Sequence, residues 1–305
     1  MASGSKKVIY AALVGNGLIA ITKFTASFLT GSSAMLTEGI HSVVDTGNQV
    51  LLLLGLKRAK KPADATHPFG HGKEIYFWSF VVAITIFAVG AGISIYEGIH
   101  SIMDPHIITN PMPNYIVLGL AMVFEAFAWF FAWREFEKQR RGRGYVETIR
   151  KEKDPVTFVV LFEDSAAMLG LIVAFLGIAA AQWTGNPVYD GVASVFIGGI
   201  LAITAGWLAW ETKGLLIGES ADPRIVEGIR GIAGEHREVK TVNETLTMHM
   251  GPQFILVNLS LDFHGDLGAG AIEQAIAAIT REIRERFPRV KRVFIEAEDY
   301  KSKPD

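Results

Sequence analysis

Residues 34–56 read AMLTEGIHSVVDTGNQVLLLLGL, and this stretch decides the class of fold. It is long enough to cross a hydrocarbon core of ~30 Å, which takes about 20 helical residues. His41 and Asp45 lie in its middle, four residues apart. An ionisable group at bilayer depth costs several kcal/mol, so such groups normally face a cavity, a partner or an ion. We therefore expect a divalent metal ion to balance this cost.

The polar residues of this stretch share one helical face. Residues i and i+4 lie about 5–6 Å apart at Cβ, so His41 and Asp45 can bind one ion together. Glu38 and Asn48 extend the same face by three residues in each direction. A continuous polar face on an apolar helix is typical of an aqueous path. The alternative is hydrogen bonding between helices by buried polar groups.

Five further apolar stretches are long enough to span a bilayer. Together with the first they predict six transmembrane helices, at roughly 8–30, 34–56, 75–100, 113–134, 155–182 and 187–212. The connectors between helices one and two, three and four, and five and six are short. The sequence thus predicts a mainly α membrane protein built as a six-helix bundle.

The basic residues of the loops fall on one side of this bundle. No Lys or Arg occurs in residues 24–56, 74–133 or 154–212. The loops after helices two and four carry Lys57, Arg58, Lys60, Lys61, Lys73, Arg134, Lys138, Arg140, Arg141, Arg143, Arg150, Lys151 and Lys153. By the positive-inside rule we expect both termini and these loops in the cytoplasm, and the protein in a bacterial plasma (inner) membrane.

Lys23 is an exception, because it lies inside the first predicted helix. We expect its ammonium group to snorkel toward the outer headgroups. An ion pair with a carboxylate of a helix is the alternative.

Two adjacent carboxylates interrupt the fifth predicted helix. Glu163 and Asp164 point about 100° apart on a helix, so they cannot face one spot equally well. We expect Asp164 to be the metal ligand, while Glu163 ligates by a longer reach or pairs with Lys23 or another group. Val160, one turn before Asp164, offers no ligand atom.

A polar loop after the second helix holds another set of ligand-type side chains. Asp64, His67 and His71 follow a DxxHxxxH spacing within a segment that Gly70, Gly72 and Pro68 shape into tight turns. We expect these three side chains to share a metal at the cytoplasmic surface. Solvated loop histidines without a ligand role are the alternative.

These residue types indicate which ions fit. One imidazole with two or three carboxylates suits zinc, and also accepts manganese, iron(II) or cobalt. The chain has no Cys, which excludes disulfides and thiolate sites. Such ligands bind metal only when deprotonated, and histidine titrates near neutrality, so His41 is a candidate carrier of a countertransported proton. This chemistry suggests the exchange of a divalent cation for protons. We expect zinc, or another of these divalent cations, as the transported ion and no resident cofactor.

The composition changes after Lys213 to that of a soluble domain. We expect a helix at 222–236, strands at 240–249 and 253–263, a helix at 272–287 and a strand at 290–296. That order, αββαβ, predicts a small two-layer α+β domain of the ferredoxin or metallochaperone type. We therefore divide the chain into a transmembrane domain, 1–213, and a cytoplasmic domain, 214–305. The net charge of −2 predicts no nucleic-acid partner.

The combination of features resembles the cation diffusion facilitator family. It rests on six helices, the His41-x-x-x-Asp45 pair, the loop from Asp64 to His71 that ends Phe-Gly-His-Gly-Lys, and the small tail. The runs around His41 and Asp45, Glu163-Asp164-Ser-Ala-Ala and Thr184-Gly-Asn-Pro-Val-Tyr-Asp190 resemble the branch that contains the human mitochondrial zinc transporter. The resemblance implies a homodimeric, proton-coupled exporter of divalent metal, usually zinc.

The chain departs from the family pattern in two places. Most relatives carry His or Asp where this chain has Val160, so Glu163, Asn48 or water is left as the fourth ligand. Zinc-binding relatives carry tail histidines where this chain has Asn243, Asn258, Glu296 and Glu298. We therefore expect the tail to contribute dimer contacts rather than metal sensing.

Two other classes of protein would also place ligands on membrane helices. An intramembrane metalloenzyme needs a general base beside an activated water; Glu163 could serve, but the chain has no His-Glu-x-x-His run. A channel or metal-responsive receptor is the third class. We expect a secondary transporter and not an enzyme.

Overall fold

The computed structural model describes residues 3–105, 110–140, 144 and 155–299, which form two compact units. The first unit contains the long helices from residues 1–57, 75–148 and 154–213. The second contains residues 58–74 together with 214–305. The loop after the second helix thus groups with the C-terminal residues rather than with the helices that flank it.

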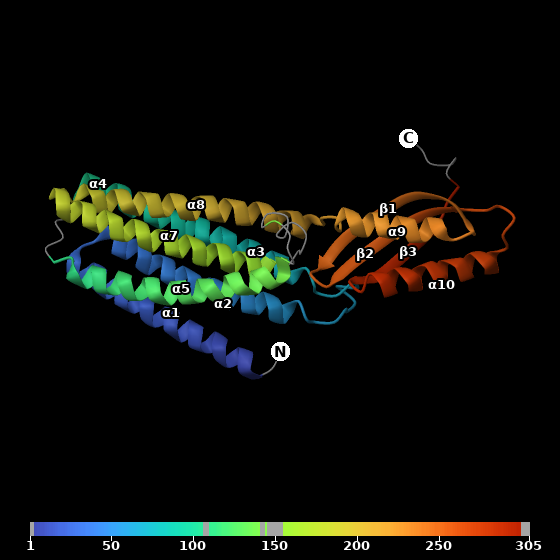
Figure 1. Cartoon of the computed structure of the whole chain (residues 1–305), viewed down its shortest axis with the longest axis horizontal. Coiled ribbons are helices and arrows are strands. Elements are labelled where there is room, and N and C mark those ends of the chain that lie inside the picture. The colour runs from blue at the N-terminus through green and yellow to red at the C-terminus, as the bar shows by residue number, and fades with distance from the viewer. Residues whose placement is uncertain (1–2, 106–109, 141–143, 145–154, 300–305) are drawn as a thin grey trace. The chain divides into compact units, whose positions relative to one another are not determined.

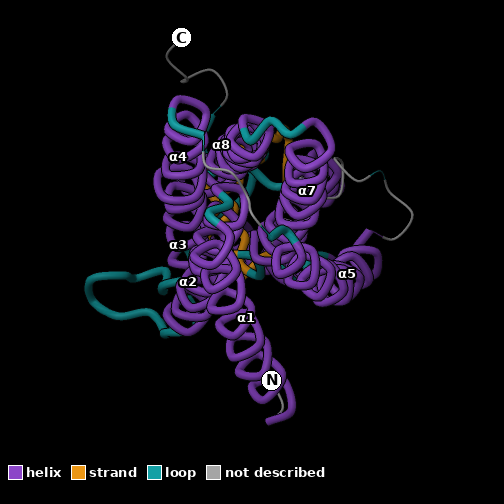
Figure 2. Tube along the Cα trace, turned by 90° about the vertical axis from the view of Figure 1, so that its left-hand side faces the viewer, coloured by secondary structure: helices purple, strands orange, loops and turns teal. Residues whose placement is uncertain are grey.

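The helices of the first unit run roughly alongside one another, as Figure 1 and the nearly end-on view of Figure 2 show. They are α1 (Ser3–Thr30), α2 (Ser33–Arg58), α3 (Glu74–Thr85), η1 (Ile86–Ala91), α4 (Gly92–Met103), α5 (Met112–Arg140), α7 (Pro155–Thr184) and α8 (Val188–Ile217). All six predicted spans are helical. The third is α3, η1 and α4 in continuous succession, where η1 is a π-helical turn of the kind found mostly inside α-helices.

Four stretches of the described part are long and apolar enough to cross a membrane. They are Glu74–Met103, Met112–Arg134, Phe158–Thr184 and Val188–Ile217. The protein is therefore a membrane protein with at least these four apolar helices in the described residues.

Small residues let α4 and α8 approach closely. A Cβ added to Gly98 on α4 would lie 2.7 Å from the Val195 amide nitrogen and 2.8 Å from the Gly191 carbonyl oxygen on α8. Gly198 meets Ile95 in the same way. Without a hydrophobic driving force between helices in lipid, such close backbone packing is a main source of helix association.

The second unit is an αββαβ arrangement. It is built from α9 (Pro223–Glu235), β1 (Val239–Gly251), β2 (Phe254–Phe263), α10 (Ala269–Arg286) and β3 (Val290–Ala297). The sheet order is β1-β2-β3, with β1 antiparallel and β3 parallel to β2. The predicted elements agree with these to within about three residues at each end, the usual uncertainty of helix and strand boundaries.

Local signals explain why these elements form where they do. Asp222 caps α9 by accepting a hydrogen bond from the Arg224 amide at 2.9 Å, and Pro223 occupies the first turn. The core is formed where both helices cover one face of the sheet. Ile229 and Ile232 of α9, Leu259 of β2 and Ile279 of α10 are at most 1% exposed.

The loop from residue 58 to 74 packs on the sheet of the second unit. The Phe69 ring meets the Phe294 ring of β3 edge-on at a centroid distance of 6.4 Å. Gly72 lies against the backbone of Met250 and Gly251, so closely that a Cβ there would collide with the Met250 carbonyl oxygen. Gly70 has φ +83°, a conformation that glycine adopts without strain.

Candidate metal sites

His41 and Asp45 lie together on α2, as their spacing predicts. The His41 Nδ1 is 3.3 Å from the Asp45 Oδ1, and the two residues are 1% and 8% exposed. Within the part of the chain that the structure describes, neither ring nitrogen of His41 has a hydrogen-bond partner, and neither does the Asp45 Oδ1. Buried polar atoms are normally satisfied, so three unpartnered ligand-type atoms side by side indicate a place for a bound ion.

The α7 side of this cluster is formed by Glu163. The Asn48 Nδ2 on α2 donates a hydrogen bond of 2.7 Å to the Glu163 Oε1. The carboxyl groups of Asp45 and Glu163 are near enough to interact electrostatically. Asp164, the residue expected to be the better ligand, is half-buried and has Glu125 and Glu163 as its charged neighbours.

In this structure the ligand atoms of the four expected residues do not surround a single position. Among the described residues, the sole set of three whose ligand atoms all lie within 4.8 Å of one another is in the loop, not in the bundle. The structure brings His41 to Asp45, and Asp45 to Glu163, as successive pairs. The assignment of His41, Asp45, Glu163 and Asp164 as ligands of one ion stays a prediction.

Glu125 on α5 is a further acidic residue that the sequence reasoning missed. It lies within electrostatic range of Asp45, Glu163 and Asp164. Ala121, one turn before it, is 1% exposed, and the indole of Trp129, one turn after it, donates a 2.9 Å hydrogen bond to Ser165 on α7. Residues four apart share a helical face, so Glu125 lies on the same side of α5 as Trp129, which contacts α7. A lone Glu within the apolar run 113–134 was the signal that could have found it.

Lys23 does not snorkel, so that expectation is wrong. Its side chain is 1% exposed, and its Nζ lies 2.9 Å from the Glu38 Oε2 and 2.8 Å from the Ser42 Oγ. The alternative, an ion pair with a helix carboxylate, is what the structure contains. α1 and α2 pack closely enough for the Glu38 carboxylate to contact the Lys23 ammonium.

The loop residues Asp64, His67 and His71 are gathered as predicted. Their ligand atoms all lie within 4.8 Å of one another, and the His71 Nε2 is 2.9 Å from the Asp64 Oδ2. The backbone helps, because the His67 amide donates to the Asp64 Oδ1 at 2.7 Å. Hydrogen bonds with His71 and Thr66 hold the pKa of the Asp64 carboxyl well below its usual range. The carboxylate is thus ionised and available to a cation at neutral pH. Metal binding there stays a prediction.

Two of the four tail residues singled out in the sequence, Asn243 and Glu298, take part in a small hydrogen-bond network. Asn243 donates to the Ser260 Oγ at 3.1 Å, and Ser260 donates to the Glu298 Oε2 at 2.7 Å. Asn258 and Glu296 are exposed. The hydrogen bonds of Ser260 with Asn243 and Glu298 join β2 to β1 and to the residues just after β3.

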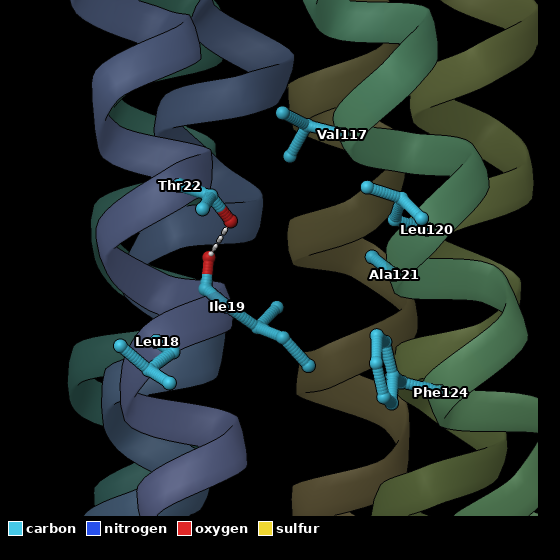
Figure 3. A pocket seen from close by; sticks show the side chains of 7 residues that line it. All are labelled: Leu18, Ile19, Thr22, Val117, Leu120, Ala121 and Phe124. Atoms are coloured by element: carbon cyan, nitrogen blue, oxygen red, sulfur yellow. Dashed lines mark hydrogen bonds between the residues drawn. The ribbon is translucent and has the colours of Figure 1, made fainter.

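A pocket of about 230 Å³ between α1 and α5 is apolar and offers no metal ligands (Figure 3). Leu18 and Ile19 on α1 face Leu120 and Phe124 on α5. The polar atom of Thr22 in its wall already donates a 2.8 Å hydrogen bond to the Ile19 carbonyl. The pocket belongs to the apolar surface of the helices.

Comparison with known proteins shows the family of this chain. Residues 9–217 match the model of the cation efflux transmembrane domain. The chain belongs to the cation efflux family, a family of transporters and not of enzymes, and it lies in the branch of the mitochondrial zinc transporters.

Three relatives illustrate the range of similarity. The mitochondrial proton-coupled zinc antiporter SLC30A9 of Xenopus laevis is 32% identical over 286 residues, which is 92% of this chain and 51% of that protein. Metal tolerance protein C4 of Arabidopsis thaliana is 29% identical, over 86% of this chain and 58% of that protein. The manganese efflux system protein MneP of Bacillus subtilis is 24% identical, over 97% and 96%. The chain thus spans about half the length of the SLC30A9 proteins it matches.

Proposed function

We propose that this protein is a proton-coupled antiporter that exports divalent metal cations, zinc first among them, from the cytoplasm. The observation that carries the proposal is the burial of His41. It is 1% exposed, lies 3.3 Å from Asp45 and has no hydrogen bond to either ring nitrogen from any described residue. A site of this kind among membrane-spanning helices needs a cation to balance it.

All six long helices span the membrane in this proposal, α1 and α2 included. The 26 residues of α2 extend about 39 Å at 1.5 Å per residue, enough to cross the hydrocarbon core. Its polar residues Glu38, His41 and Asn48 are buried, while Val43 and Val50 are 52% and 50% exposed. A helix that turns its polar face inward and its apolar face outward suits lipid surroundings.

The ion binds between α2 and α7. His41 and Asp45 supply one nitrogen and one carboxylate, and Glu163 and Asp164 supply carboxylates from α7, after their side chains turn toward His41. Protons and metal compete for the same atoms, because each ligand binds the ion only when deprotonated. Proton entry therefore expels the ion, which is the coupling that an antiporter requires. A second ion binds at Asp64, His67 and His71, supported by their ligand atoms lying within 4.8 Å of one another.

Manganese is the second candidate for the cargo. The relative from Bacillus subtilis is named for manganese efflux, and a site of imidazole and carboxylates accepts manganese as well as zinc. The relatives named SLC30A9 are zinc antiporters, and their higher identity favours zinc.

The basic loops support an orientation with both termini in the cytoplasm, and we propose the bacterial inner membrane and a homodimer. Two apolar side chains of the sheet are exposed, Leu246 at 52% and Phe294 at 48%, the latter even though the Phe69 ring contacts it. Exposed apolar patches mark interaction sites, so a dimer contact through the second unit is consistent with them. Light scattering of the purified protein measures the oligomeric state.

Flux into proteoliposomes tests the proposal. The protein should move zinc into vesicles at a rate that scales with an imposed pH gradient and vanishes when a protonophore collapses it. Zinc movement that ignores the gradient would indicate a channel instead. The same assay with manganese as competitor separates the two candidate cargoes.

A further inference from the structure

The ion pair between Lys23 and Glu38 lies beside the metal face of α2 and has no part in the proposed transport cycle. Both side chains are essentially excluded from solvent, at 1% and 0% exposure. The Lys23 Nζ contacts the Glu38 Oε2 at 2.9 Å and the Ser42 Oγ at 2.8 Å. Ser42 directly follows His41, so the ammonium reaches the same turn of helix as the imidazole.

Glu38 is positioned to become a metal ligand if it were released. It lies one turn before His41 on the same helical face, where side chains three residues apart are neighbours. Its second oxygen, Oε1, has no hydrogen-bond partner among the residues that the structure describes. That oxygen faces α7 at Gly170, where a Cβ would come within 2.5 Å of it. Lys23 therefore binds one carboxylate oxygen of Glu38, and the other oxygen is left to accept a cation.

We propose that Lys23 is a resident cation that keeps Glu38 out of the coordination sphere of the transported metal, and so sets the affinity of the site. The inference rests on the proposed function. A carboxylate paired to an ammonium at 2.9 Å is neutralised in place. The affinity of a cation site rises with the number of charged ligands. A transport site must bind weakly enough for the ion to leave.

The neighbouring carboxylates explain why Glu38 has to be kept away from the metal. Glu125 lies within electrostatic range of both Lys23 and Glu38, and Asp45, Glu163 and Asp164 add further carboxylates on α2 and α7. Without Lys23, a divalent ion would meet one more carboxylate next to His41. The Lys23 ammonium supplies a fixed positive charge beside Glu38. Because Lys23 is part of α1, a transported ion cannot displace this charge.

Zinc binding to purified full-length protein in detergent, measured by isothermal titration calorimetry, tests the proposal. We expect Lys23→Met to lower the zinc Kd by about tenfold or more, as one charged ligand is added. Lys23→Arg keeps the cation and should stay within about threefold of the parent protein, a small energy on the affinity scale. An unchanged or higher Kd in folded Lys23→Met protein would overturn the proposal.

The double variant Lys23→Met with Glu38→Gln separates release of Glu38 from simple charge repulsion. It removes both charges of the pair and leaves neither partner unpaired, so it is also the variant expected to fold if Lys23→Met does not, since breaking a buried pair on one side is strongly destabilising. We expect its zinc Kd to lie within about threefold of the parent value. Tightening that persists in the double variant would show repulsion by Lys23 as the cause. Binding that is about tenfold weaker would show Glu38 to be a ligand already. Either result overturns the proposal.

The parent protein is the control that distinguishes failure of the proposed function from failure of the proposed role of Lys23. If the parent protein binds no zinc in the calorimeter and moves none in vesicles, the proposed function fails. If the parent protein binds and transports zinc while the Lys23 variants miss the expected pattern, the role of Lys23 alone fails.

Discussion

Asp190 on α8 caps the N-terminus of α2 through Ser33. The Asp190 Oδ2 accepts hydrogen bonds from the Ser33 amide at 2.6 Å, the Ser33 hydroxyl at 3.0 Å and the Ala34 amide at 3.3 Å. Ser32 satisfies the next amide, that of Met35, with its own hydroxyl at 3.2 Å. The first amides of a helix have no partner within it and carry the positive end of its dipole. A buried carboxylate from another helix therefore anchors the helix that carries His41.

Asp190→Asn should destabilise the protein by about 1–3 kcal/mol, because an amide group replaces a charge-assisted acceptor of several donors. Thermal unfolding in detergent should show a lower midpoint than for Asp104→Asn, a matched change at an exposed position beyond the end of α4. Equal midpoints for the two variants would mean that the cap contributes little.

Asp45→Ala should abolish zinc flux, since it removes a charged ligand from a site with few of them. Asp45→Asn, which keeps the shape and removes the charge, should be nearly as inactive. The measurement is pH-driven flux into proteoliposomes with equal amounts of folded protein. Normal flux in both variants would contradict the assignment of the site to α2.

Val160→His should tighten zinc binding, because it supplies an imidazole one turn before Asp164 on α7, at the position where the family resemblance implies a ligand. Val160→Ala is the control, since it changes the packing without adding a ligand atom. Calorimetric titration with zinc compares the two. If the histidine variant binds no more tightly than the alanine variant, position 160 does not face the ion.

Gly72→Ala should displace the loop that carries His71 from the sheet, because the new Cβ collides with the Met250 carbonyl oxygen. We expect faster amide hydrogen exchange in residues 58–74 and weaker metal binding by the loop. Gly265→Ala is the control, as nothing lies within 4 Å of a Cβ there. Identical exchange in the two variants would show that the loop does not need this close contact.

Sequence reasoning succeeded where the determining property is local. The long helices follow from runs of apolar residues, and the αββαβ order follows from periodicity and from caps such as Asp222-Pro223. His41 and Asp45 share a helical face because of their spacing alone. The gathering of Asp64, His67 and His71 was also predictable, since turn-forming residues hold them within one short loop.

The side-chain contacts between helices could not be predicted from the sequence. The rotation of α7 that turns Glu163 rather than Asp164 toward Asn48 depends on packing against several neighbours at once. The acidic Glu125 and the pairing of Lys23 with Glu38 depend on the same packing. For Lys23 the sequence left two outcomes open, and the burial of α1 against α2 chose the ion pair.

The order of amino acids thus determined which segments are helices or strands, and which polar groups each helix carries along one face. Only the tertiary structure decided which of those groups meet across helices, that Asp190 anchors α2, and that residues 58–74 pack with the C-terminal sheet. Hydrophobic periodicity and turn chemistry act over a few neighbouring residues. The partner of a buried charge is chosen by the packing of segments that are far apart in the chain.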